Sequence, residues 1–107
     1  MRFEIILAPQ AIEGLKRVRA GFRPGALDAI EQHLRHEPTK ASRSRIKRLR
    51  GLDRPQYRLR VDEVRVFYDV TEGRVEVLSI IPKEQAEGWL AKAGVPTPPR
   101  RPGEDEG

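Results

Sequence analysis

The segment QYRLRVDEVRVFYDV, residues 56–70, carries three arginines whose spacing could create an anion site. Apolar and polar residues alternate on both sides of its central Asp-Glu pair, which predicts two antiparallel strands joined by a tight turn. In the register of a symmetric turn, Arg60 faces Arg65 and Arg58 faces Phe67. Two like charges directly across a strand pair repel each other. A phosphate group between them would bind both guanidinium groups, so we expect an anion site on this hairpin.

The same residues allow an interpretation without a ligand. The arginines could extend into solvent, or they could pair with Asp69 and Glu76, which the register places on the same face. Phe67, beside Arg58, could stack on a nucleic-acid base or pack as a satellite of the core. A loop with an odd number of residues would shift the register and separate the two facing arginines.

Positive charge is concentrated around this hairpin. The 107-residue chain has a formal net charge of +5 from 21 basic and 16 acidic residues. Residues 40–60 hold nine of the basic residues and one of the acids, Asp53, so the rest of the chain is net negative. A local excess of this kind is typical of a surface that binds a polyanion or an acidic partner.

The composition excludes several kinds of site. Because the sequence contains no cysteine, the chain has no disulfide, thiolate zinc site or cysteine nucleophile. His33 and His36 could share a helical face, but no third ligand accompanies them, so we expect neither a metal site nor a cofactor. No apolar run is long enough to span a bilayer, and the N-terminus lacks a signal-peptide layout. We therefore expect a cytoplasmic protein with no membrane partner.

Hydrophobic periodicity predicts the elements that hold the hairpin in place. We expect strands over 2–8, within 45–52, in the hairpin and over 75–81, and helices over 9–20, from Pro24 to Pro38 and over 83–94. The helical hairpin should pack through the apolar residues Ile12, Leu15, Val18, Leu27, Ile30 and Leu34. The fold class is α+β in the order β-α-α-β-β-β-α: a small antiparallel-dominated sheet with a helical hairpin on one face. The opposite face should be partly open.

A single domain over 1–94 accounts for all of these elements. The Pro-rich segment 95–107 has no apolar pattern, and we expect it to be a disordered tail. By parity along the strands, Tyr57 and Tyr68 are core residues. Trp89 is expected to pack in the last helix, with stacking on a base as the alternative.

The run LRGL, then YRLRVDEVRVFYDV, TEGRVEVLSII and PKEQAEGWL, resembles the RelE/ParE toxin superfamily. The resemblance covers residues 2–93 and implies a RelE-like fold with a basic concave face. It also implies the toxin of a type II toxin–antitoxin system, neutralised by a cognate antitoxin. RelE-type members are ribosome-dependent mRNA endoribonucleases, or mRNA interferases. They need no metal, because the ribose 2′-hydroxyl attacks the adjacent phosphate and the protein stabilises the resulting charge.

Carried over position by position, the resemblance assigns roles to six residues. The expected catalytic residues are Arg60 and Arg65, and we add Lys83, at the exit of the last strand, as a further catalytic candidate. The expected RNA-binding residues are Lys47, Arg48, Arg50 and Arg58. Glu84 is a further candidate base, although it also suits the start of a helix.

Two departures from the family pattern keep alternatives open. Members with clear activity often have lysines where this chain has Arg58 and Arg60, and an arginine cannot be deprotonated to move a proton. The arginine and tyrosine usual after the last strand are also absent, with Lys83 and Trp89 near their places. The chain could instead be a ParE-like toxin that inhibits a DNA topoisomerase, or an inactive RelE-fold protein that only binds an antitoxin.

Overall fold

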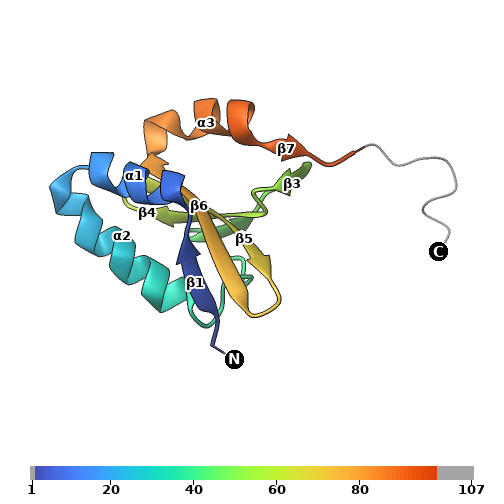
Figure 1. The fold of residues 1–107 in the computed structure, drawn as a ribbon, viewed down its shortest axis with the longest axis horizontal. Helices are drawn as coiled ribbons and strands as arrows, with labels where there is room; N and C mark the ends of the chain where they lie inside the picture. Colours follow the sequence, from blue (N-terminus) through green and yellow to red (C-terminus); the bar gives the residue numbers. More distant parts are fainter. Residues whose placement is uncertain (1, 99–107) are drawn as a thin grey trace, which may run out of the picture.

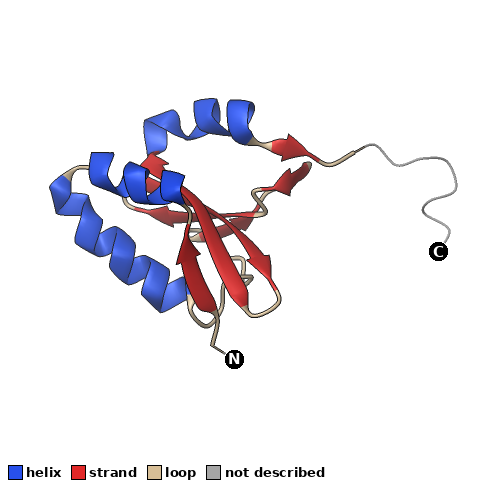
Figure 2. Ribbon diagram, in the orientation of Figure 1, coloured by secondary structure: helices blue, strands red, loops and turns tan. Residues whose placement is uncertain are grey.

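The structure, a computed structural model, describes residues 2–98, which form an α+β fold with one main sheet (Figures 1 and 2). In sheet order the strands are β1 (Glu4–Leu7), β6 (Arg74–Pro82), β5 (Val64–Thr71), β4 (Tyr57–Val61) and β2 (Ile46–Arg48). Strand β1 runs parallel to β6, and the other neighbouring pairs are antiparallel. The predicted fold class is therefore confirmed, and so is the edge strand expected within 45–52.

Helices α1 and α2 form the expected hairpin on one face of this sheet (Figure 1). Pro9 and Pro24 lie in their first turns, where a missing N–H leaves no helical hydrogen bond unmade. The helical segments are α1 (Pro9–Arg17), a 3-10 turn (Ala20–Phe22), α2 (Arg23–Ala29) with its π-helical continuation (Ile30–Leu34), a second 3-10 turn (Lys83–Gln85) and α3 (Ala86–Ala93). Helix α1 therefore ends at Arg17, three residues before the predicted end of the helix at residue 20.

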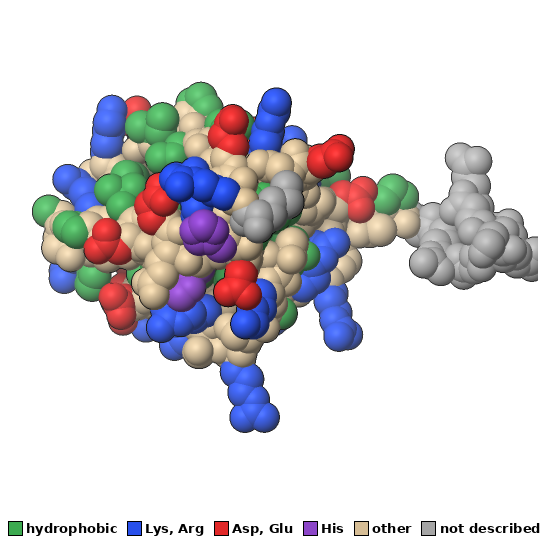
Figure 3. Space-filling view, turned by 90° about the horizontal axis from the view of Figure 1, so that it is seen from below, with side chains coloured by type: hydrophobic (Ala, Val, Ile, Leu, Met, Phe, Trp, Pro, Cys, Tyr) green, Lys and Arg blue, Asp and Glu red, His purple; other side chains and the backbone are tan. Residues whose placement is uncertain are grey.

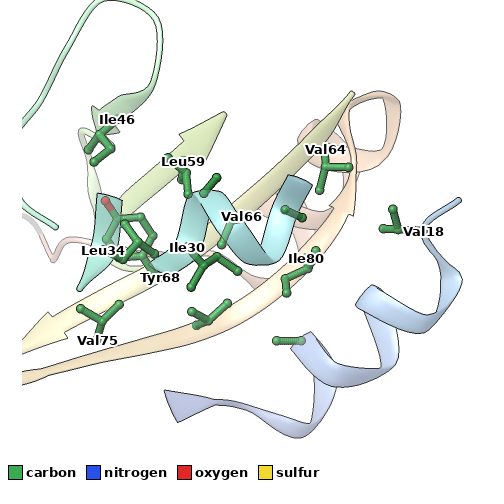
Figure 4. Packing of buried hydrophobic residues seen from close by; sticks show 14 residues of the cluster. Val18, Ile30, Leu34, Ile46, Leu59, Val64, Val66, Tyr68, Val75 and Ile80 are labelled. Atoms are coloured by element: carbon green, nitrogen blue, oxygen red, sulfur yellow. The ribbon is translucent and has the colours of Figure 1, made fainter. Parts of the chain in front are cut away.

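The core lies between the sheet and the helical hairpin (Figure 4). Leu59, Val66 and Tyr68 on the sheet pack with Ile30 and Leu34 of the second helical segment, and all five are almost completely buried. The Tyr68 hydroxyl donates a hydrogen bond to the Pro38 carbonyl at 2.6 Å, which satisfies its buried polar atom. The expectation that Tyr68 belongs to the core is confirmed, and Tyr57 stacks on it with ring centroids 5.5 Å apart.

Two of the expected packing residues are not in the core. Ile12 and Leu27 are each 41% exposed, whereas Ala11 and Ala26 are completely buried. For Ile12 the reason is the close approach of α1 to β6: a Cβ on Gly14 would lie only 2.1 Å from the Ile80 carbonyl oxygen. At that separation the small side chains must face the sheet, and the larger ones turn outward.

A small second sheet joins β3 (Leu52–Arg54) to β7 (Val95–Pro96). The Thr97 N–H adds a hydrogen bond to the Gly51 carbonyl at 2.9 Å. The prediction of a tail that is disordered from residue 95 is therefore wrong for the two β7 residues. The remainder of that predicted tail, over 99–107, lies outside the described residues.

Candidate nucleic-acid interface

The face of the main sheet opposite α1 and α2 carries the arginines, and we refer to it as the open face. Strand β4 pairs with β5 so that Arg60 is opposite Arg65 and Arg58 is opposite Phe67, which confirms the predicted register. Strand β2 adds Lys47 beside Arg58. Since same-face residues alternate along a strand, the open face includes Lys47, Arg58, Arg60, Arg65, Phe67 and Ser79 and, farther along, Asp69 and Glu76.

Carboxylates do not neutralise these arginines within residues 2–98. Asp69 and Glu76 are held instead by Arg54, whose Nε lies 3.3 Å from Asp69 Oδ2 and whose terminal nitrogen lies 3.0 Å from Glu76 Oε1. In addition, the Gln56 N–H donates a hydrogen bond to Asp69 Oδ1 at 2.7 Å. Arg58, Arg60 and Arg65 make no ion pair with any acid in the described part of the chain. This observation removes the pairing that would have explained the cluster without a ligand.

The arginines of the open face act on one another electrostatically. Burial lowers the pKa of Arg58, and the charges of Arg65 and Arg60 lower that pKa further. The pKa of Arg65 is lowered by burial and by Arg60, while Glu63 opposes the shift. A guanidinium stays charged under these shifts. Each one therefore contributes positive potential at a place where an anion would relieve the repulsion.

Backbone contacts fix the orientation of Arg65. Its terminal nitrogen donates to the carbonyl oxygens of Asp62 and Val64, at 2.9 and 3.0 Å. Asp62 occupies the turn with a positive φ of 49°, a conformation that aspartate tolerates better than most residues. The turn therefore holds the guanidinium beside Arg60, and less side-chain freedom remains to be lost when a ligand binds.

Lys83 lies at the edge of the open face, where β6 ends. Its Nζ is 3.0 Å from Glu63 Oε2, and its N–H donates to the Glu63 carbonyl at 2.8 Å. Both residues line an open hollow of about 430 Å³, together with Arg60, Arg45, Ser44 and Asp62. The structure thus brings Lys83 and Arg60, two of the candidate catalytic residues, to one hollow.

Two of the expected RNA-binding residues lie away from the cluster. Arg48 pairs in register with Tyr57, so it lies on the helix side of the sheet, where its guanidinium is 5.2 Å from the Tyr57 ring centroid. It also donates to the Gln56 carbonyl at 2.8 Å. Arg50 lies in the turn between β2 and β3, outside the ladder. The structure therefore places Lys47 and Arg58 with the catalytic candidates but not Arg48 or Arg50.

An aromatic pair covers part of the open face. Phe67 is completely buried because the Trp89 ring of α3 stacks on it, with centroids 4.9 Å apart and planes 22° apart. The sequence left open whether Phe67 faces a ligand or packs as a satellite of the core, and in this structure it packs. Ser79, opposite Phe67 in β6, was not predicted as a site residue.

Near the two histidines, side chains of both charges lie close together (Figure 3), unlike those around Arg60 and Arg65. Figure 3 shows Lys and Arg side chains interspersed with Asp and Glu around the two histidines. Arg35 pairs with Glu31, and Lys40 pairs with Glu37 at 3.3 Å. Paired surface charges of this kind have little net field, so the open face remains the candidate interface for an anion.

Searches for a metal site and for a membrane span gave no candidate in the part of the chain that the structure describes. No group of three or more His, Asp or Glu residues within 2–98 is arranged to hold a metal ion. Within the same residues, no helix is long and apolar enough to cross a membrane.

Comparison with known proteins identifies the fold. No family model matches the sequence, and no curated protein matches it. The RelE–RelB complex from Pyrococcus horikoshii contains a chain with a TM-score of 0.62 and 21% identity; the match covers 78% of this chain and 97% of that one. The RelB–RelE complex from Methanococcus jannaschii gives 0.63 and 18%, over 79% and 98% of the two chains. The YoeB–YefM complex from Staphylococcus aureus gives 0.54 and 19%, over 76% and 97%. The protein therefore has a RelE-like fold.

Proposed function

We propose that this protein is the toxin of a type II toxin–antitoxin system and that it cleaves mRNA on the ribosome. The observation that carries the proposal is the facing pair Arg60 and Arg65, neither of which forms an ion pair with a carboxylate from residues 2–98. Two guanidinium groups opposite each other on a strand pair suit a phosphate of the RNA backbone. The RelE-like fold supports the same function, because the similar structures are toxin–antitoxin complexes.

The reaction would place the scissile phosphate between the two arginines. The ribose 2′-oxygen forms a bond to phosphorus, the bond to the 5′-oxygen breaks, and the 2′-hydroxyl proton leaves while another proton reaches the 5′-oxygen. Arg60 and Arg65 stabilise the charge that develops on the phosphate oxygens. Arg58 and Lys47, in the next row of the open face, bind the neighbouring backbone.

Proton transfer must come from other groups, because arginine keeps its proton in this setting. Lys83 reaches the same hollow as Arg60 and is the candidate donor to the 5′-oxygen. Its ion pair with Glu63 would hold the ammonium group in position. Glu84 lines a different hollow, together with Arg17 and Glu63, so it is a weaker candidate for the base.

The partners implied by this proposal are the ribosome with its mRNA and a cognate antitoxin. A cytoplasmic location follows from those partners. An acidic or amphipathic antitoxin segment would match the positive open face and exclude RNA from it.

Ribosome-dependent cleavage of a defined mRNA, read by primer extension, tests the proposal. We expect the wild type to cut and Arg60→Gln to cut at least about 100-fold more slowly, the loss expected when a donor to the developing charge is removed. Arg65→Lys keeps the charge but not the bidentate fork and should also be slow. Arg74→Gln is the matched control, since Arg74 is exposed at the far end of the β5–β6 hairpin. Cleavage by Arg60→Gln at the wild-type rate would overturn the assignment.

A second candidate function is antitoxin binding without cleavage. The observation that favours it is that Lys83 is already engaged by Glu63, while the remaining candidates on the open face are arginines, which do not exchange protons. In that case the wild type would leave mRNA intact in the same assay but still bind its antitoxin. Inhibition of DNA supercoiling by the purified protein would identify the ParE-like alternative.

A further inference from the structure

Three buried polar atoms without partners surround the Phe67 ring. Within residues 2–98, the side-chain atoms that are buried and make no hydrogen bond are Arg58 Nε, Ser79 Oγ and Trp89 Nε1. Arg58 and Ser79 are the two ladder neighbours of Phe67, in β4 and β6, and Trp89 stacks on its face. Leaving such atoms unpaired destabilises the packed state, and native proteins usually avoid it. Their concentration at one place indicates that these groups have partners in another state.

Helix α3, which covers these atoms, is attached mainly at its two ends. Before it, the Lys83 N–H and Nζ bind Glu63. After it, β7 pairs with β3. The helix has no buried residue of its own, has no side-chain cap at its N-terminus and contains Gly88 in open space. Its middle is therefore held chiefly by the Trp89–Phe67 stack, and α3 can lift there while both ends remain attached.

A cleft already reaches the edge of this helix. It has a volume of about 310 Å³, lies between α1 and the start of α3, and is lined by Gln10, Arg17, Ser79, Gln85 and Trp89 among others. Ser79 is only 1% exposed and its Oγ is sealed from the cleft. Movement of Trp89 off Phe67 would extend the cleft to the hydroxyl and to the face of the phenyl ring.

We propose that α3 is a lid and that the surface beneath it, the Phe67 ring with Arg58 Nε and Ser79 Oγ at its sides, receives a nucleobase of single-stranded RNA. An aromatic face stacks any base, and the guanidinium and hydroxyl supply polar partners for a base edge. The row that contains Arg60 and Arg65 is adjacent on the same face, about 7 Å along the strand. A nucleotide can therefore place its phosphate on the arginine pair and its base on Phe67. This inference rests on the proposed function, since it takes RNA as the ligand.

Trp89 is the only tryptophan in the chain, so its fluorescence reports the lid directly. The experiment titrates the full-length protein, at low salt, with a short single-stranded RNA and with an abasic strand of the same length and charge. Binding is measured separately by the anisotropy of a dye on the strand. We expect both strands to bind, but only the strand with bases to shift the Trp89 emission to longer wavelength, because the indole moves into water.

Ser79→Ala and Trp89→Ala separate a binding role from a structural one. Ser79→Ala removes an unpaired buried hydroxyl, so it should raise the melting temperature while it weakens binding of the base-containing RNA by about tenfold, as expected when a contact to a base is lost. Trp89→Ala removes the lid, so it should tighten that binding while leaving abasic binding unchanged. Thr39→Ala, at an exposed position, is the matched control and should change neither quantity.

Each contrary outcome has one meaning. Equal Trp89 emission with both strands, or wild-type RNA affinity in Ser79→Ala, would overturn the base site while leaving the proposed mRNA cleavage intact. Failure of both strands to bind would overturn the base site and the arginine phosphate site together. Loss of cleavage activity with an intact, base-dependent shift would instead reject the proposed function alone.

Discussion

Arg60 and Arg65 face each other directly across the β4–β5 ladder, while the carboxylates farther along that face, Asp69 and Glu76, are bound by Arg54. Two like charges therefore face each other, and the two nearby carboxylates that could neutralise them form ion pairs with Arg54 instead. An arrangement of this kind lowers stability slightly and raises affinity for an anion. It follows that stability and anion binding should respond in opposite directions to a change at this pair.

Arg60→Gln tests that opposition. The change removes the facing charge, so the free energy of unfolding should rise by up to about 0.5 kcal/mol at low ionic strength. The gain should vanish in high salt, because salt screens the repulsion in the wild type. Urea unfolding at two salt concentrations measures both effects, with Arg43→Gln in the exposed linker as control. A less stable Arg60→Gln protein would contradict the idea that the pair is strained.

Gly14→Ala should destabilise the protein even though alanine favours a helix. The added methyl group would meet the Ile80 carbonyl oxygen of β6 at 2.1 Å, so α1 must move away from the sheet. We expect a net loss of about 2 kcal/mol, since overpacking outweighs the gain in helix propensity of about 1 kcal/mol. Gly25→Ala in α2 is the control, because its added methyl meets no atom within 4 Å and should stabilise the protein. Thermal melts that show the two variants changing alike would refute this reading of the α1–β6 contact.

Asp69 should matter more to stability than Glu76, although Arg54 binds both. Asp69 is only 9% exposed and accepts a hydrogen bond from the Gln56 N–H, whereas Glu76 is partly exposed and has Arg54 alone. Asp69→Ala should therefore cost about 1–3 kcal/mol by leaving a buried N–H unsatisfied. Glu76→Gln should change stability by less than about 0.5 kcal/mol. Chemical denaturation of the two variants gives the comparison, and equal effects would show that the Gln56 bond adds nothing.

His33 should make the fold less stable in mild acid. Burial lowers the pKa of His33, and the neighbouring Arg45 guanidinium, 3.2 Å from its Nε2, lowers that pKa further. The unfolded chain then binds the proton more readily than the folded one, so stability is lost as the pH falls through the ordinary histidine value of 6.5. Melting temperatures between pH 7.5 and 5 should fall less in His33→Gln than in the wild type. His36→Gln, at an exposed position, should behave like the wild type.

Much of the β4–β5 hairpin could be predicted from the sequence, because its strand pattern and its turn depend on residues that are close together in the chain. Alternation fixes which face each residue takes, and a symmetric turn fixes that Arg60 meets Arg65. The neighbouring β5–β6 pairing could not be predicted in the same way. Its register shifts between Phe67 and Tyr68, so Ser79 rather than Leu78 lies opposite Phe67. Such a bulge depends on how the whole strand packs, and the alternating pattern carries no sign of it.

The side chains through which the helical hairpin packs, and the pairing of β7 with β3, were missed for a different physical reason. Large apolar residues such as Ile12 and Leu27 dominate a periodic pattern, but the face that packs is the one with small side chains, which let α1 approach β6 closely. The pairing of β7 with β3 is likewise a tertiary contact between segments about 40 residues apart in sequence. Neither the packing face of the helical hairpin nor the β7–β3 pairing is indicated by residues close together in sequence. Both could therefore be found only from the three-dimensional structure.

Strand β6 has a further consequence for the order in which the molecule can form. It pairs with β1, the first strand, on one side and with β5 on the other, and α1 packs against it. A nascent chain that stops before residue 74 therefore contains β1 and α1 but lacks β6, the strand with which β1 pairs and against which α1 packs. Assembly of the main sheet must therefore wait until β6 has been synthesised, although β1 and α1 are made first.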